Sequence, residues 1–208
     1  MTSSLHALFQ TLFFGWLDTQ VAPDAPVEGV TPDFAALLAT EPASFSFDTL
    51  VHREPLPGWT WRAIEFGDIF DGRFFFYVPL AWSTLEQQGP WAWLSEGGAR
   101  LQSIVVVHWS HWGPHVRGLV EQGRVLAFAY YPLYRPSYHQ WIFALAGEDG
   151  PGATLHAAFS AGDWLVAVEG AAADGPEVAR QLTALVNSNP WYGWIEAAKA
   201  QRQTSGDR

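Results

Sequence analysis

Three histidines lie close together in the chain and are its residues best suited to metal chemistry. His108, His111 and His115 occur in the stretch HWSHWGPH. Neutral imidazole is a ligand that zinc, nickel and copper accept, so these side chains could hold a divalent metal. Their spacing fits one helix face, but Gly113-Pro114 is expected to interrupt a helix there. We therefore expect His108 at the end of a strand and the other two on the following turn and helix. They could converge there, or be unrelated.

Sequence motifs for nucleophilic catalysis and phosphate binding are absent. There is no Gly-x-Ser-x-Gly, no P-loop and no dinucleotide-binding fingerprint. Ser110 precedes His111, but a triad also needs a buried acid that orients the base. The chain has no cysteine, which excludes disulfides, thiolate metal sites and a cysteine nucleophile. The sequence favours a protein that is not an enzyme and has no cofactor, unless the histidines bind a divalent metal.

Aromatic residues are abundant, with 12 tryptophans in 208 residues. Exposed aromatic side chains and arginine are favoured at binding surfaces, whereas buried ones only fill a core. Two predicted loops, Pro90–Trp93 and Tyr130–Tyr138, and the first helix are the candidate contact regions. The residues that we predict to bind a partner are Trp91, Trp93, Tyr131, Tyr134, Arg135 and Trp16.

The leading functional prediction is a non-enzymatic interaction or accessory module whose partner is another protein or a second copy of this chain. Two alternatives stay open. One is a metal-binding protein or metal-dependent enzyme that uses the three histidines. The other is a binder of a small ligand or glycan in a tryptophan-lined cleft. His139 and His156, on neighbouring predicted strands, are either packing residues or a functional pair.

Charge and hydropathy limit the partner and the location. The formal net charge is −10, which disfavours nucleic acid as a partner because phosphate binding needs clustered basic residues. The start of the chain carries no Lys or Arg, and no run of apolar residues is long enough for a membrane span. We therefore expect a cytoplasmic protein.

The first 40 residues are expected to form a helical segment with a proline-rich linker. Apolar residues recur every three or four positions from Leu5 to Leu17, which predicts an amphipathic helix. Three prolines and a glycine in residues 22–33 predict irregular structure. Thr31 is a candidate N-cap for a short helix over Pro32–Thr40. Residues 41–200 are expected to form a single α+β domain, and residues 201–208 a frayed tail.

Period-two patterns predict most of the remaining chain to be antiparallel strands. Asp71-Gly72 predicts a tight hairpin that joins Arg62–Phe70 to Arg73–Val78. Further strands are expected at Phe45–Thr49, Ser103–Trp109, Arg124–Tyr131, Tyr138–Ala146, Ala153–Ser160 and Asp163–Glu169. Helices are expected at Pro114–Gln122, Pro176–Ser188 and Trp191–Ala200. The fold class is α+β, a mostly antiparallel sheet covered by helices in a three-layer α/β/α sandwich.

This order of elements resembles the PsbP-like family, which includes photosystem II extrinsic proteins and DcrB-like proteins. The similar stretch covers about residues 73–188. It is carried by Phe74–Val78 running into Pro79-Leu-Ala-Trp82, by Ile104–Val107, and by the last two strands with the helix Pro176–Ser188. The chain departs from the family in its N-terminal segment of about 40 residues and in lacking a lipoprotein or transit signal. The resemblance implies a three-layer fold and a non-catalytic accessory role.

Overall fold

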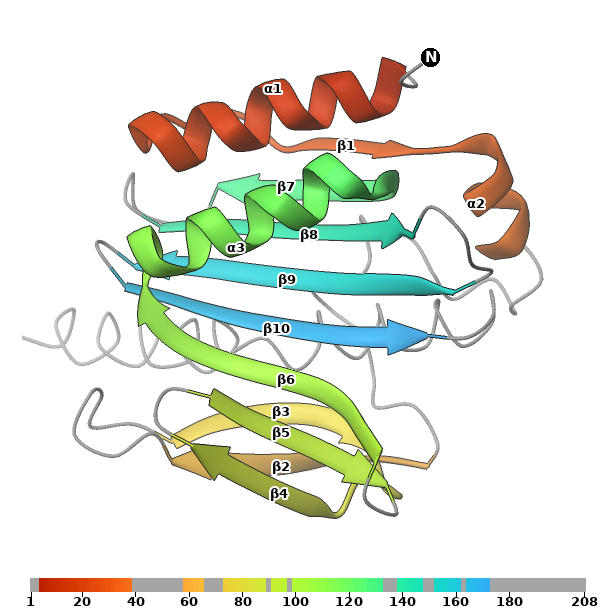
Figure 1. The fold of residues 1–208 in the computed structure, drawn as a ribbon, viewed down its shortest axis with the longest axis vertical. Coiled ribbons are helices and arrows are strands. Elements are labelled where there is room, and N and C mark those ends of the chain that lie inside the picture. The colour runs from red at the N-terminus through yellow and green to blue at the C-terminus, as the bar shows by residue number, and fades with distance from the viewer. Residues whose placement is uncertain are drawn as a thin grey trace, which may run out of the picture.

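Helices and antiparallel strands make up the described part of the chain, so the α+β class is confirmed. The computed structural model describes residues 4–38, 58–65, 73–88, 91–96, 99–132, 138–147, 152–161 and 164–172. Within these ranges, an eight-stranded antiparallel sheet has the order β1-β7-β8-β9-β10-β6-β5-β4, and β2 and β3 form a separate two-stranded sheet. In Figure 1, α1 and α3 lie over the end of the large sheet that contains β1, β7, β8 and β9.

The first helix, α1 (Ser4–Thr19), is confirmed and packs on the sheet. Its buried residues are His6, Phe9, Phe13, Trp16 and Leu17. Leu8, which the sequence assigned to the buried face, is 46% exposed. The buried stripe is narrower than the apolar stripe in the sequence, because one sheet surface covers only part of a helix circumference. Residues 4–38 therefore share a core with the later strands.

The segment predicted to be an irregular linker contains a strand, β1 (Val27–Val30), which pairs with β7. That prediction is wrong at these residues because Pro23 and Pro26 both precede the strand, so neither removes a donor from its ladder. The helix α2 (Pro32–Leu38) follows at once. Thr31 caps it as predicted, since its Oγ1 accepts a hydrogen bond from the Phe34 N–H at 3.3 Å.

The strands of the C-terminal half lie close to the predicted positions. They are β6 (Ala99–His108), β7 (Arg124–Pro132), β8 (Tyr138–Ala146), β9 (Ala153–Ala161) and β10 (Trp164–Ala172). The predicted central strand, β6, lies between β10 and β5. The order of β7, β8, β9 and β10 in the sheet follows their order in the chain, as in a meander of short connections.

The predicted hairpin is confirmed for β2 (Trp59–Glu65) and β3 (Arg73–Pro79), in which Glu65 pairs with Arg73. The predicted turn at Asp71-Gly72 lies outside the described residues. The helix prediction in the middle of the chain needs correction. The helix α3 spans Trp109–Gln122 and contains Pro114, which was expected to start it. A proline inside a helix costs one backbone hydrogen bond, and the burial of Trp112, Val116 and Val120 from this helix offsets that cost.

Besides β1, two more of the described strands were not predicted, namely β4 (Thr84–Gln88) and β5 (Trp91–Glu96). The sequence assigned Trp91 and Trp93 to a loop, whereas both lie on β5, which pairs with β4 on one side and β6 on the other. The segments are short, and Gly and Pro residues flank them, so the local pattern favoured a loop. Pairing with the long strand β6 defines them as strands.

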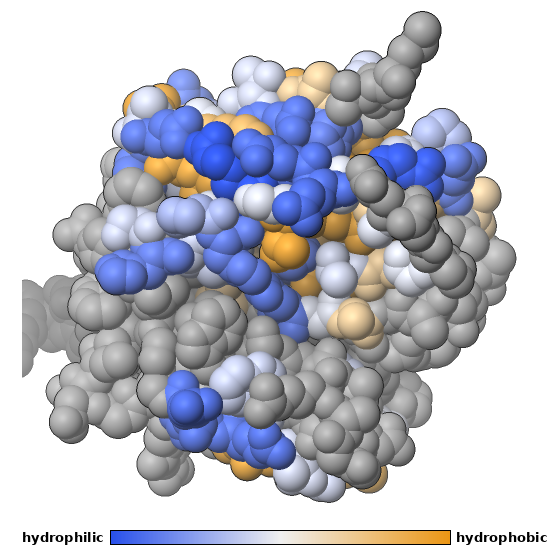
Figure 2. Space-filling model, viewed as in Figure 1, coloured by the Kyte–Doolittle hydropathy of each residue, from blue (hydrophilic) through white to orange (hydrophobic). Residues whose placement is uncertain are grey.

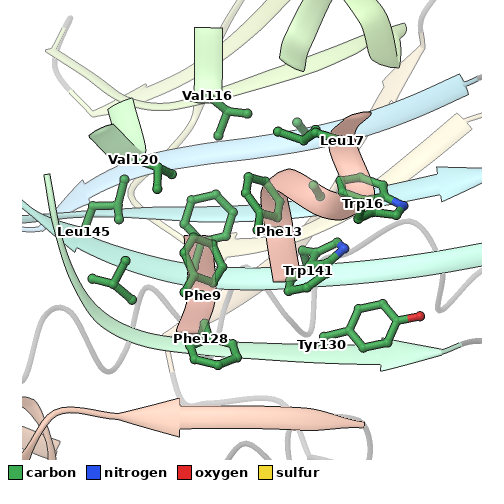
Figure 3. Packing of buried hydrophobic residues seen from close by; sticks show 14 of the residues in the cluster. Phe9, Phe13, Trp16, Leu17, Val116, Val120, Phe128, Tyr130, Trp141 and Leu145 are labelled. Atoms are coloured by element: carbon green, nitrogen blue, oxygen red, sulfur yellow. The ribbon is translucent and has the colours of Figure 1, made fainter. Parts of the chain in front are cut away.

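The core lies between α1, α3 and the sheet, and its centre is aromatic (Figure 3). Phe9 is fully buried, and its ring centroid lies 4.9 Å from that of Phe13, 5.2 Å from Phe128 and 5.0 Å from Phe143. Tilted and offset ring pairs at such distances each add about 0.5–1.5 kcal/mol to the gain from burying apolar area. In Figure 3 the aromatic side chains of α1 point into the sheet toward Phe128 and Trp141.

Several predicted elements lie outside the described residues. They are the strand Phe45–Thr49, the helices Pro176–Ser188 and Trp191–Ala200, and the tail 201–208. The described helices α1 and α3 cover one face of the sheet, so the three-layer arrangement stays a prediction. No helix in the described ranges has the length and hydropathy to cross a membrane.

Candidate functional site

The strand β4 forms one edge of the large sheet, and all five of its residues are exposed. Among the described elements it pairs with β5, with Glu86 opposite Trp93 and Gln88 opposite Trp91. Leu85 points to the other face of the strand and is 42% exposed. In Figure 2 a hydrophilic patch lies over β4 at the bottom of the view, separate from the hydrophilic surface of α1 and α3. We call β4 together with Trp91 and Trp93 the open edge.

One row of paired residues crosses the sheet from the open edge to the core. Residues directly opposite one another on antiparallel strands lie on the same face. From β4 to β7 the row consists of Glu86, Trp93, Ser103, Glu169, His156, Phe143 and Phe128. The helices α1 and α3 cover its aromatic end, and in Figure 1 no described helix lies over β4, β5 or β6. Trp93, near the uncovered end of the row, is partly buried.

A carboxylate lies on β10, next to the part of the sheet that α1 and α3 cover. Glu169 on β10 is 16% exposed, and its Oε1 accepts a hydrogen bond from the Trp112 indole N–H at 3.3 Å. His115 Nε2 lies 3.2 Å from Oε1 and 3.3 Å from Oε2 of the same carboxylate. His156 Nδ1 lies 3.6 Å from Oε1, and its Nε2 contacts Thr154 Oγ1 at 3.1 Å. We call Glu169, His115, His156 and Trp112 the carboxylate cluster.

The cluster keeps Glu169 ionised. Burial alone would raise the pKa of this carboxyl, but the hydrogen bond with His115 and the positive charges that His156 and His115 can carry outweigh burial. The pKa of Glu169 therefore lies well below its ordinary range. The hydrogen bond with Glu169 in turn raises the pKa of His115, against the smaller effect of its partial burial. Both shifts favour the ionised forms of the two groups, and their contact links α3 to β10.

The three histidines predicted to bind a metal lie at the start of α3 and the end of β6. His108 is the last residue of β6 and pairs with Trp164. His111 and His115 are exposed and lie one turn apart on α3, with His115 held by Glu169. Within the described part of the chain, no group of three or more His, Asp or Glu residues is arranged to hold a metal ion. The metal site stays a prediction.

The residues predicted to bind a partner divide into three groups. Trp91 and Trp93 are at the open edge. Tyr131 lies on β7 opposite Gln140, while Tyr134 and Arg135 are outside the described residues. Trp16 is 0% exposed and packs against Phe13 and Trp141, so we withdraw it as a surface residue. An apolar helix face can either pack on the core or be offered to a partner, and the spacing of Trp16 in the sequence fits both.

The side chains of five tryptophans are described, and four of them are buried. The buried ones are Trp16, Trp82, Trp112 and Trp141. This distribution removes these four from any exposed tryptophan-lined cleft and leaves Trp93 as the partly accessible one. The two histidines on neighbouring strands are not a pair, because His139 pairs with Ser160 and its Nδ1 contacts Tyr130 Oη at 2.8 Å, whereas His156 pairs with Phe143.

Glu169, Trp112 and Glu86 were not among the site residues predicted from the sequence. Glu169 could have been noticed as an acidic residue inside the apolar run WLVAVEGAA, at a position where alternation predicts partial burial. Glu86 gave no such signal, because its role depends on β4 being an edge strand. Comparison of the chain with protein-family models and with curated proteins found no match. The PsbP-like resemblance therefore stays a prediction.

Proposed function

We propose that this protein is a non-enzymatic interaction module that takes up an extended segment of a partner protein along β4. The observation that carries this proposal is the exposure of all five residues of β4, which lies at the end of the large sheet among the described strands. An edge strand offers main-chain donors and acceptors to an incoming strand, and many peptide-binding domains use this mode. An accessory role of the kind that the PsbP-like resemblance implies would fit such a module.

The side chains around β4 support strand addition. Leu85 supplies an exposed apolar contact on one face. Trp93, paired with Glu86 on the other face, supplies a large, partly accessible ring one strand away from the edge. Neighbouring strands lie about 4.8 Å apart, so an added strand would be about 10 Å from β5, a separation that the Trp93 side chain and a long side chain of the added strand could span together. Main-chain hydrogen bonds to the added strand would then provide affinity, and contacts with Leu85 and Trp93 would provide selectivity. A cytoplasmic location accompanies this proposal.

The test is selection of short peptides from a random display library against the full chain, followed by hydrogen exchange of the complex. We expect enriched peptides to have a strand-forming, alternating pattern and to slow amide exchange in residues 84–88. Exchange in residues 27–30, on the opposite edge of the sheet, is expected to stay unchanged.

Substitution of Trp93 provides the matched test of the side-chain contribution. Trp93→Ala is expected to weaken the selected peptides roughly tenfold, the usual loss for an aromatic interface residue. Val30→Ala, on the opposite edge strand, is the control and should leave binding unchanged. Peptides that bind but protect other residues, or a selection that enriches nothing, would refute the proposal.

A further inference from the structure

Three buried hydrogen-bond donors gather at one end of the aromatic core. The indole N–H groups of Trp16 and Trp141 and the hydroxyl of Ser160 have no hydrogen-bond partner among the described residues. All three side chains are at most 1% exposed. An unpaired buried donor lowers the stability of the fold, so nearly all buried donors in proteins are paired. We call these three side chains the donor cluster, and their chemistry indicates an acceptor that the described residues do not supply.

The donor cluster comes from three elements that meet beside His139. Trp16 lies near the C-terminal end of α1, Trp141 on β8 and Ser160 on β9. The ring centroid of Trp16 lies 5.9 Å from that of Trp141 and 6.3 Å from that of His139. Ser160 is directly opposite His139 on the neighbouring strand and shares its face. In Figure 3 the two indole nitrogens and the hydroxyl of Tyr130 point to the same side of the cluster.

Tyr130 and His139 border the donor cluster on the side away from Phe9. Tyr130 Oη and His139 Nδ1 share a hydrogen bond at 2.8 Å. Burial and the nearby negative charge of Asp24 raise the pKa of Tyr130 to about 12, so its hydroxyl keeps its proton at neutral pH. His139 is partly exposed, whereas Tyr130 is buried. A small molecule would therefore reach the donors from solvent past His139.

The donor cluster favours a neutral acceptor. An indole N–H donates and cannot accept, so Trp16 and Trp141 offer two donors to one occupant. A carbonyl oxygen has two lone pairs and brings no proton, whereas a water molecule brings two protons that need acceptors of their own. The charge of Asp24 near Tyr130 disfavours an anion such as a carboxylate. The surrounding rings would pack against an apolar body.

We propose that the donor cluster binds the carbonyl oxygen of a small, neutral and largely apolar molecule that enters beside His139. The body of this molecule would pack against the rings of Tyr130 and Trp141, whose centroids are 4.6 Å apart. The inference is independent of strand addition along β4, because it concerns the half of the sheet that α1 covers. Binding there stabilises the folded protein, since the unfolded chain lacks the site.

The test measures the thermal unfolding midpoint of the full chain with three probes of similar shape, namely acetophenone, ethylbenzene and benzoate. Acetophenone has the carbonyl group, ethylbenzene lacks its oxygen, and benzoate carries a negative charge. At about tenfold its dissociation constant, acetophenone is expected to raise the midpoint by about 3–6 °C. Ethylbenzene and benzoate at the same concentration should raise it by less than about 1 °C, because one offers no acceptor and the other is charged.

Substitutions that remove one donor with little change of shape provide the matched variants. Ser160→Ala and Trp141→Phe should each reduce the acetophenone shift to that of ethylbenzene. Trp82→Phe, at a buried tryptophan outside the aromatic core cluster, is the control and should keep the full shift. The indole N–H resonances of Trp16 and Trp141 give a second measurement, and acetophenone is expected to move both because it accepts their hydrogen bonds.

Four results would overturn the inference. Equal shifts with acetophenone and ethylbenzene would mean that the site does not use the donors, and a larger shift with benzoate would mean that it selects an anion. A preference for acetophenone that survives in both Ser160→Ala and Trp141→Phe would place the ligand elsewhere. An unchanged midpoint together with unmoved indole resonances would show that the donor cluster binds no carbonyl. None of these results bears on strand addition along β4.

Discussion

The two edge strands of the described sheet, β1 and β4, differ in how far other elements cover them. At one edge β1 has four residues, runs directly into α2, and lies under α1, where Gly29 is in contact with Leu5 and Phe128. At the other edge β4 is exposed along its whole length. Proteins protect sheet edges by keeping them short and covered, or by charging them. The β1 edge uses the first device, whereas β4, at the other end of the described sheet, is exposed at every residue.

The same contrast extends to the two halves of the sheet face. The half formed by β7, β8 and β9 packs against α1 and α3 through Phe9, Phe13 and Trp141. The half that ends at β4 carries Trp93 and Glu86 and has no described helix over it (Figure 1). We infer that stability is concentrated in the first half and the binding of a partner strand in the second. The predictions below test this division in order of expected effect.

The largest effect is expected from removing a ring at the centre of the covered half. Phe9→Ala should lower the free energy of unfolding by about 3–5 kcal/mol, the usual cost of a cavity left by a buried phenylalanine. Leu85→Ala at the open edge is the matched apolar truncation and should cost less than about 0.5 kcal/mol. Denaturant unfolding of both variants measures the difference. Equal losses of unfolding free energy in the two variants would contradict the inference that stability is concentrated in the half formed by β7, β8 and β9.

A smaller effect is expected at the covered edge. A Cβ atom at Gly29 would lie 2.3 Å from Leu5 Cδ1 and 2.8 Å from Phe128 Cε1, so Gly29→Ala should destabilise the protein by about 1–3 kcal/mol. Gly15, in the middle of α1, has no atom within 4 Å of such a Cβ. Gly15→Ala should therefore stabilise the protein by up to about 1 kcal/mol through helix propensity. Thermal unfolding of the two variants measures these changes in stability. If Gly29→Ala left the stability unchanged, β1 would not be packed closely under α1.

The smallest effect concerns the carboxylate cluster at the boundary between the two halves. Because the pKa of Glu169 is lowered, its ionised carboxylate contributes to folding stability above its ordinary pKa of 4.5, and this contribution is lost as the pH falls. Because the pKa of His115 is raised, its protonated imidazole contributes to folding stability below its ordinary pKa of 6.5, and this contribution is lost as the pH rises past the raised value. Glu169→Gln should therefore cost most between these two values, by about 1–2 kcal/mol.

The control for this prediction is the exposed Asp18–Arg117 ion pair, which joins α1 to α3. Asp18→Asn should cost less than about 0.5 kcal/mol, as is usual for surface ion pairs. Unfolding measured across the pH range separates the two variants. If the cost of Glu169→Gln were independent of pH, Glu169 would act through packing alone and not through its charge.

Much of the fold could be predicted because it is encoded locally. The strands β7, β8, β9 and β10 lie near their predicted bounds, since alternating side chains and flanking turn residues act within each segment. The predictions failed where pairing overrides the local signal, as in β1 within a proline-rich segment and in β5, whose tryptophans had been assigned to a loop. Trp91 and Trp93 stay predicted contact residues, and His115, which was predicted to bind a metal, lies 3.2 Å from Glu169.

The amino-acid sequence by itself determined the α+β class, the amphipathic α1 and the approximate positions of β7, β8, β9 and β10, because these depend on residues that are neighbours along the chain. Only the tertiary structure decided that Trp16 is buried, that β4 is an edge, and that Glu169 is an ionised group beside His115. Glu169 and His115 are 54 positions apart, and Glu86 matters only because of the strand order. Burial, edge position and pKa depend on which distant segments lie side by side, and local patterns do not specify that.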